Sequence, residues 1–168
     1  QDVSLGRLGL SRIPLALNKL INLRTLMLHN NNISRIENVD QLVELRNLNL
    51  DANQIAVIEG LDGLVNLESL GLVGNKIKSF NGLKGLVGLA QLALDNNEIA
   101  RLEGLDGLEN LEELFLNGNS ISFIENLDGL VGLKKIVLTH NNIDKGDPKN
   151  HEQIMKLIRR RPPVHVEV

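Results

Sequence analysis

The sequence of 168 residues contains no cysteine, no tryptophan and no tyrosine. Without cysteine there is no disulfide bond, no thiolate metal ligand and no cysteine nucleophile, which excludes disulfide-stabilised domains, zinc-thiolate sites and cysteine-dependent enzymes. A net charge of -3 argues against a nucleic-acid partner, since phosphate binding needs a broad basic surface. No apolar run reaches the roughly 18 to 20 residues of a membrane span, so we expect no membrane partner either. The chain opens at Gln1 without a signal-peptide pattern, and we expect it to begin inside a longer or processed protein.

Leucine is plentiful instead, and it recurs with a period of 22 residues. The composition is 42% hydrophobic but only 2% aromatic, a bias that is typical of repeated sequences. Six consecutive copies without an insertion occupy residues 20–143. The period is clearest in one leucine column and one asparagine column, which consist of Leu20, Leu42, Leu64, Leu86, Leu108 and Leu130, and of Asn31, Asn53, Asn75, Asn97, Asn119 and Asn141.

The spacing within each copy predicts its local structure. Leu26 and Leu28 are two positions apart, which is the period of a strand with both side chains pointing inward. After the asparagine, apolar residues recur every three positions, which favours a short 3₁₀ or extended return segment over an α-helix. We interpret the asparagines as structural, with amides that satisfy backbone groups where each strand ends. Because one copy cannot bury its own leucines, the copies stack into a curved solenoid with a parallel sheet on its inner face.

The two ends depart from the repeat. Residues 1–19 are a degraded repeat or an N-terminal cap, and residues 144–168 are a C-terminal cap helix and tail, all within one structural domain. Asp147 and Pro148 predict a helix start, and residues 148–160 form an amphipathic pattern. Ile154, Leu157 and Ile158 fall on its apolar face, and Arg159, Arg160 and Arg161 suit its C-terminal end. The tail at residues 164–168 alternates like a strand, which leaves a sheet edge or a loose end as alternatives.

The stretch IENVDQLVELRNLNLDANQI at residues 36–55 resembles the 22-residue class of leucine-rich repeats. That class is found in the protein phosphatase 1 regulatory subunit and in bacterial internalins. The resemblance covers about three quarters of the chain and implies an α/β fold, a right-handed leucine-rich repeat solenoid with a concave parallel sheet. It also implies a non-enzymatic protein-interaction scaffold that grips a protein partner on the concave face.

Residues that flank the inward leucines are expected to project from the concave face. The middle column is mostly small, and Phe115 and Val137 lie side by side in it, so we expect a partner to bind around this pair with Phe115 as its anchor. Asp51 and Asp95 add negative charge, which favours a partner with a basic or mixed surface. The predicted partner-binding set is Phe115, Val137, Glu113, Lys135, Asp95, Val73, Asp51 and Met27.

We predict no enzyme, and no catalytic, cofactor or metal site. His29 and His140 belong to strands that are roughly 24 Å apart at about 4.8 Å per strand, so they share neither a metal nor a proton. His140, Asp144, Asp147 and His151 form a weak candidate for a divalent metal site, against the alternative of a solvated cap. Ser120 and Ser122 have no histidine and aspartate placed to complete a hydrolytic triad.

Two functional alternatives stay open. In the first, the chain is a cytoplasmic, monomeric scaffold that binds another protein. In the second, it is a recognition or spacer segment of a larger bacterial surface, secreted or multidomain protein. The absence of cysteine favours the cytoplasm over a eukaryotic extracellular location, but bacterial surface proteins also lack cysteine.

Overall fold

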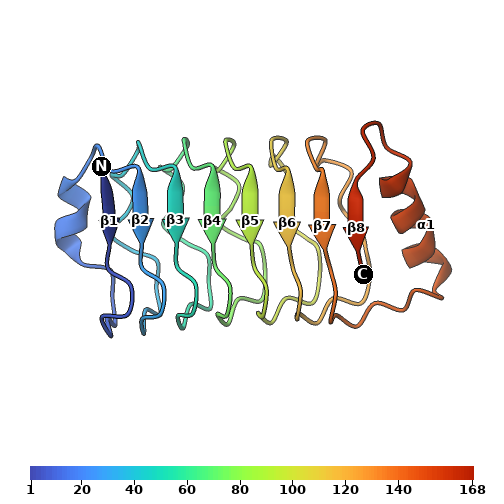
Figure 1. Cartoon of the computed structure of the whole chain (residues 1–168), viewed down its shortest axis with the longest axis horizontal. Coiled ribbons are helices and arrows are strands. Elements are labelled where there is room, and N and C mark those ends of the chain that lie inside the picture. The colour runs from blue at the N-terminus through green and yellow to red at the C-terminus, as the bar shows by residue number, and fades with distance from the viewer.

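The first leucine of each Leu-x-Leu pair is the middle residue of a three-residue strand, and the strands assemble into one sheet. The computed structural model describes residues 1–168 as a single row of stacked turns (Figure 1). All neighbouring strands are parallel, in the order β1 to β8. The strands are β1 (Asp2–Ser4), β2 (Thr25–Met27), β3 (Asn47–Asn49), β4 (Ser69–Gly71), β5 (Gln91–Ala93), β6 (Glu113–Phe115), β7 (Lys135–Val137) and β8 (His165–Glu167). The predicted leucine-rich repeat solenoid is confirmed.

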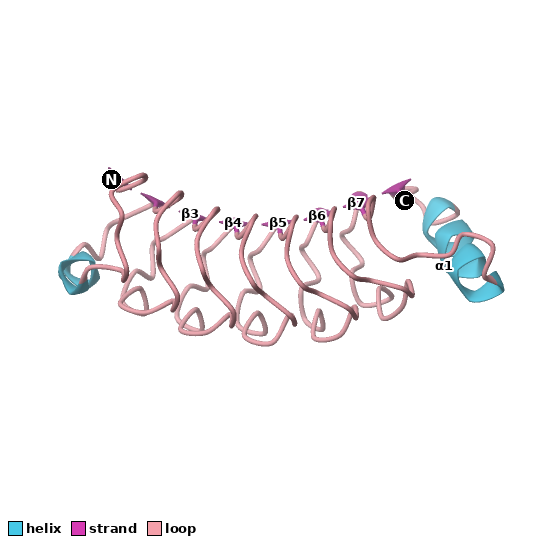
Figure 2. Cartoon of the chain, turned by 90° about the horizontal axis from the view of Figure 1, so that it is seen from below, coloured by secondary structure: helices cyan, strands magenta, loops and turns pink.

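The sheet lines the inner side of a curved molecule, and the return segments form the outer side (Figure 2). Between them lies one core of 42 buried apolar residues. The return segments are built from tight turns, as when the Leu42 amide donates to the Val39 carbonyl at 2.9 Å. Gly82 has a φ of 98° in such a turn, and a Cβ there would overlap the Ile58 carbonyl oxygen. The predicted 3₁₀ or extended character of these segments is therefore confirmed.

The asparagine column joins neighbouring repeats through hydrogen bonds. The Asn53 side-chain amide donates to the carbonyls of Leu28 at 3.1 Å and Leu50 at 2.9 Å. Its oxygen accepts a hydrogen bond from the Ile33 amide at 3.0 Å, in the preceding repeat. The same pattern recurs in the later repeats, so the structural interpretation of these residues is confirmed.

The N-terminal residues continue the sheet. Val3 of β1 is aligned with Leu26 of β2, in the register that relates later repeats. A short 3₁₀ helix follows at Leu15–Lys19. The asparagine of the next repeat serves this end too, because Asn31 accepts a hydrogen bond from the Leu8 amide at 3.1 Å. The division of the chain at residues 19 and 143 stays an interpretation of the repeat frame.

A helix and a strand complete the C-terminal end. Helix α1 (Pro148–Ile158) begins as predicted, with the Asp147 carboxylate accepting a hydrogen bond from the Lys149 amide at 2.8 Å. It ends two residues before the predicted position 160, and Leu157 is buried whereas Ile158 is 46% exposed. The assignment of Ile158 to the apolar face is wrong, because a step of one residue turns a helix by about 100°.

The tail forms β8 beside β7, so the sheet-edge alternative is correct. The His165 amide donates to the Lys134 carbonyl at 2.8 Å, and the Leu138 amide donates to the Glu167 carbonyl at 2.6 Å. Helix α1 lies next to β8 at the end of the solenoid (Figures 1 and 2). At 11 residues it is too short to cross a membrane, and no other helix has the length and apolar character to do so.

Candidate functional site

The concave face is formed by the residues on either side of each buried leucine. In β2, Leu26 is buried and its neighbours Thr25 and Met27 are partly exposed, and the next four strands repeat this alternation. Register brings the middle column together as a row across the sheet, in the order Met27, Asn49, Gly71, Ala93, Phe115 and Val137.

Phe115 and Val137 lie in register on β6 and β7, but they differ in exposure. Phe115 is partly exposed, whereas Val137 is only 9% exposed. Val137 is therefore much less accessible than its place in the concave column suggests, and its role in partner binding stays a prediction. The reason for this burial is β8, which the repeat frame does not extend to, and which places Glu167 directly beside Val137.

Lys135 covers part of the Phe115 ring. Its Nζ lies 5.6 Å from the ring centroid, within the range of a cation–π contact, and 3.0 Å from a Glu167 carboxylate oxygen. The hydrogen bonds from Lys135 and His165 hold the pKa of Glu167 below its usual value. A partner that packs on Phe115 therefore also meets an ion pair fixed at the C-terminal end of the sheet.

A row of polar side chains runs across the sheet towards the ion pair of Lys135 and Glu167. Ser69 Oγ donates to Gln91 Oε1 at 3.1 Å, and Gln91 Nε2 donates to Glu113 Oε2 at 2.7 Å. Glu113 is aligned with Lys135 on the next strand. The predicted pair of Glu113 and Lys135 thus stands at one end of a connected row that begins on β4.

The small residues of the middle column leave a hollow in the concave face. The hollow has a volume of about 190 Å³, and its lining includes Met27, Asp51, Gly71, Gln91 and Ala93. A Cβ at Gly71 would lie 2.9 Å from Asp51 Oδ1. The absence of a side chain at Gly71 therefore lets the Asp51 carboxylate lie over the strand.

Asp51 and Asp95 occupy the column beyond the strands, with Val73 between them. Asp51 Oδ1 accepts a hydrogen bond from the Val73 amide at 2.8 Å, and Asp95 Oδ1 accepts one from the Asn117 amide at 2.9 Å. Desolvation by burial raises the pKa of Asp95, the Asp51 charge adds to this effect, and the hydrogen bond from the Asn117 amide opposes it. Neither carboxylate forms an ion pair with a basic side chain.

Comparison with known proteins shows what this repeat and this architecture are similar to. A family model described as leucine-rich repeats in two copies matches residues 21–64 and 43–85. A solved leucine-rich repeat protein of Leptospira interrogans is 29% identical and superposes with a TM-score of 0.86 over 99% of this chain. The chain thus contains leucine-rich repeats and has the fold of a leucine-rich repeat solenoid.

Two internalins of Listeria monocytogenes are also similar to this chain. One is 27% identical, with a TM-score of 0.73 over 83% of this chain, and internalin C2 is 28% identical, with a TM-score of 0.64 over 88%. The chain spans 42% of the Leptospira protein, 40% of the first internalin and 74% of internalin C2. No curated protein sequence gives a significant match. Leucine-rich repeat folds are generally protein-interaction scaffolds, and they are typically non-enzymatic.

The aspartates near the C-terminal cap bind backbone amides, whereas the two histidines there do not. Asp147 caps α1, Asp144 Oδ1 accepts a hydrogen bond from the Gly146 amide at 2.8 Å, and His140 Nδ1 lies 2.7 Å from Asn117 Oδ1. His151 is exposed on α1. No three histidine, aspartate or glutamate side chains are grouped so that they could hold a metal ion.

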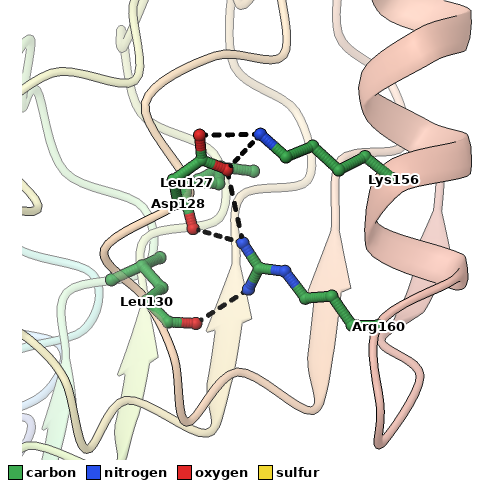
Figure 3. Close-up of polar contacts among 5 residues, drawn as sticks. All are labelled: Leu127, Asp128, Leu130, Lys156 and Arg160. Atoms are coloured by element: carbon green, nitrogen blue, oxygen red, sulfur yellow. Dashed lines mark hydrogen bonds and ion pairs between the residues drawn. The ribbon is translucent and has the colours of Figure 1, made fainter.

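Two residues attach the cap through contacts that the sequence did not predict. Asn150 is 1% exposed, and its side chain bonds the Ile124 amide at 2.9 Å and the Ser122 carbonyl at 3.0 Å. Arg160 donates to the carbonyls of Leu130 at 2.9 Å and Leu127 at 2.8 Å (Figure 3). Both residues lie outside the repeat, so no column pattern marked them.

Phe123 was also missed, although the repeat could have shown it. It is 49% exposed in a return segment, beside Lys149 and Glu152 of α1. Its column includes Arg35, Val57 and Arg101, which are all exposed. The phenylalanine with the most exposed side chain is therefore Phe123 rather than the predicted anchor Phe115.

Proposed function

We propose that this chain is a non-enzymatic scaffold that binds a protein partner on the concave face of β2–β7. The observation that supports this most directly is the partly exposed Phe115 ring, which shares one continuous face with a hollow of about 190 Å³. A ring and an adjoining depression offer a partner both an apolar contact and a place for a projecting side chain.

The predicted residues take different parts in this proposal. Phe115 supplies the apolar contact, worth about 1.5 to 3 kcal/mol if the side chain becomes fully buried. Val137 lies beside Phe115 on the next strand and, at 9% exposure, offers a partner little surface. Glu113 and Lys135 offer polar contacts beside the ring, and Met27, Asp51, Val73 and Asp95 surround the hollow or adjoin it.

The test compares capture of proteins from a lysate of the source organism by the wild type and by Phe115→Glu. We expect one captured protein to be lost by at least about tenfold, because a carboxylate replaces the apolar contact. Val87→Glu is the matched control, since Val87 is 53% exposed in a return segment outside the sheet. A protein that binds the wild type and both variants equally would contradict a concave-face site.

A second candidate function is a recognition or spacer segment of a larger protein. It is favoured by the finding that the chain spans 42% and 40% of the length of two similar structures. An isolated chain that captures no partner, although the protein isolated from its source does, would support this candidate. Cytoplasmic location and a monomeric state stay predictions from the sequence, with a secreted or surface location as the alternative.

A further inference from the structure

We propose that the hollow between β3 and β5 receives a lysine or arginine side chain from the partner. This inference rests on the proposed function, because it names the chemistry of the segment that docks on the concave face. It is carried by the shape of the hollow and by the distribution of charge around it.

The shape leaves room for one side chain to enter from above the sheet. Gly71 and Ala93 are neighbours in the register of β4 and β5, so the floor of the hollow has almost no side chains. The Asp51 carboxylate forms part of the wall, held by the Val73 amide and by Asn49 Nδ2 at 2.8 Å. Asp95 follows two strands later, about 10 Å away at roughly 4.8 Å per strand. The Asp51 carboxylate already covers Gly71, so a long, flexible side chain that enters over Ala93 brings its charged end within reach of both carboxylates.

The charge pattern selects a cation rather than a neutral or anionic group. Elsewhere in the repeats the carboxylates of five glutamates form ion pairs with lysine or arginine, namely Glu59, Glu68, Glu98, Glu103 and Glu112. On the concave face, Asp51, Asp95 and Glu113 have no such partner. Lys135 is the basic residue of this face nearest to them in register, and it is paired with Glu167. Negative charge without a counterion is thus concentrated around the hollow.

The environment of Asp95 also favours a cationic side chain in the hollow. Partial burial disfavours its charged form in the free protein, and the Asp51 charge adds to that effect. A cation placed between the two carboxylates would offset both effects. A basic side chain therefore gains electrostatic binding free energy at this site, and a neutral side chain of the same length does not.

The experiment selects peptides from a displayed random library on the immobilised wild-type chain and measures their affinities by fluorescence polarisation. We expect the selected peptides to be enriched in lysine or arginine. Asp51→Asn/Asp95→Asn should weaken their binding by at least about tenfold, since asparagine keeps the hydrogen-bond acceptor but removes the charge. Asp62→Asn/Asp106→Asn is the matched control, because both residues are exposed in return segments, and it should leave binding unchanged.

Ala93→Leu provides an independent steric test, because it fills the floor of the hollow without changing any charge. We expect it to weaken the same peptides to a similar extent, with the folded state checked by circular dichroism. Selected peptides that lack basic residues, or that bind Asp51→Asn/Asp95→Asn as tightly as the wild type, would overturn the inference. If such peptides are still lost with Phe115→Glu, the concave scaffold stands and only its cationic partner is wrong; if they are kept, both proposals fail.

Discussion

At the scale of single residues, the asparagine column shows how a polar side chain becomes part of the core. The Asn75 side-chain amide donates to the carbonyls of Leu50 at 3.1 Å and Leu72 at 3.0 Å, and its oxygen accepts from the Ile55 amide at 3.0 Å. These three backbone groups therefore have partners although they are buried. The repeat thus uses one side chain to close its own turn and to fasten the preceding one.

We expect Asn75→Ala to lower the free energy of unfolding by about 3 kcal/mol, because it leaves several buried backbone groups without hydrogen bonds. Urea denaturation measures this loss. Asn110→Ala is the control, because the exposed Asn110 side chain makes a single hydrogen bond, to the Val87 carbonyl, and its loss should cost less than about 1 kcal/mol. Equal losses in the two variants would show that the buried asparagine column stabilises the fold no more than an exposed asparagine does.

The 22-residue period predicts the burial and orientation of a residue well wherever its repeat has another repeat on each side. The inward leucines and the asparagines are such residues, and the structure places them as the spacing predicts. Val137 is more buried than the repeat frame predicts, because its neighbour on one side is the tail rather than another repeat. The hollow at Gly71 could not be located from sequence, because its wall depends on the side-chain conformation of Asp51.

At the scale of elements, the C-terminal cap is joined to the last repeat by polar contacts as well as by apolar ones. Leu157 and Val164 enter the core, while Arg160 bonds two carbonyls of the last return segment. Lys156 adds an exposed ion pair with Asp128 at 2.7 Å (Figure 3). Exposed pairs of this kind contribute little, so we attribute the fixed position of the cap mainly to Leu157 and Arg160.

We expect Arg160→Ala to loosen α1 and β8 selectively, because the carbonyls of Leu127 and Leu130 lose their partly buried donor. Hydrogen exchange should rise at least about tenfold for residues 148–167 and stay unchanged for β2–β5. Arg159→Ala is the matched control, since Arg159 is exposed and forms no side-chain hydrogen bond or ion pair. Uniform loss of protection along the chain would contradict a local role.

The sequence predicts the start of α1 better than its attachment. The Asp147 and Pro148 signal is local, because capping involves only residues within one turn. The pairing of β8 with β7 is not local, and the short alternating segment at residues 164–168 does not by itself distinguish a strand from a loose end. Arg160 was predicted only to complement the helix dipole, since nothing in its own segment indicates the carbonyls that it reaches.

At the scale of the whole molecule, each strand contacts only its sequence neighbours in the sheet. Stability in such a stack is approximately the sum of repeat and interface contributions, so the position of a defect decides how far it spreads. The ends have one interface and the centre has two. A central repeat therefore couples both halves of the solenoid, and a terminal one does not.

We expect Leu94→Ala, at a fully buried central site, to lower the free energy of unfolding by about 2 to 5 kcal/mol and to weaken protection from hydrogen exchange on both sides. Leu17→Ala, in the first 3₁₀ helix, should instead increase exchange in residues 1–24 and leave β4–β7 protected. Equal loss of protection in β5 and β6 from the two variants would contradict nearest-neighbour coupling.

The repeat has no insertion between residues 20 and 143, so equivalent positions on the inner face are evenly spaced. Any two side chains of one column are separated by a whole number of steps of about 4.8 Å. From Gly71 to Phe115 is two such steps, so a ligand that reaches both sites must itself carry groups at that separation. Removal of one complete copy from between them would shorten this distance by one step. The shortened protein would then favour ligands whose two contacting groups are closer together by the same amount.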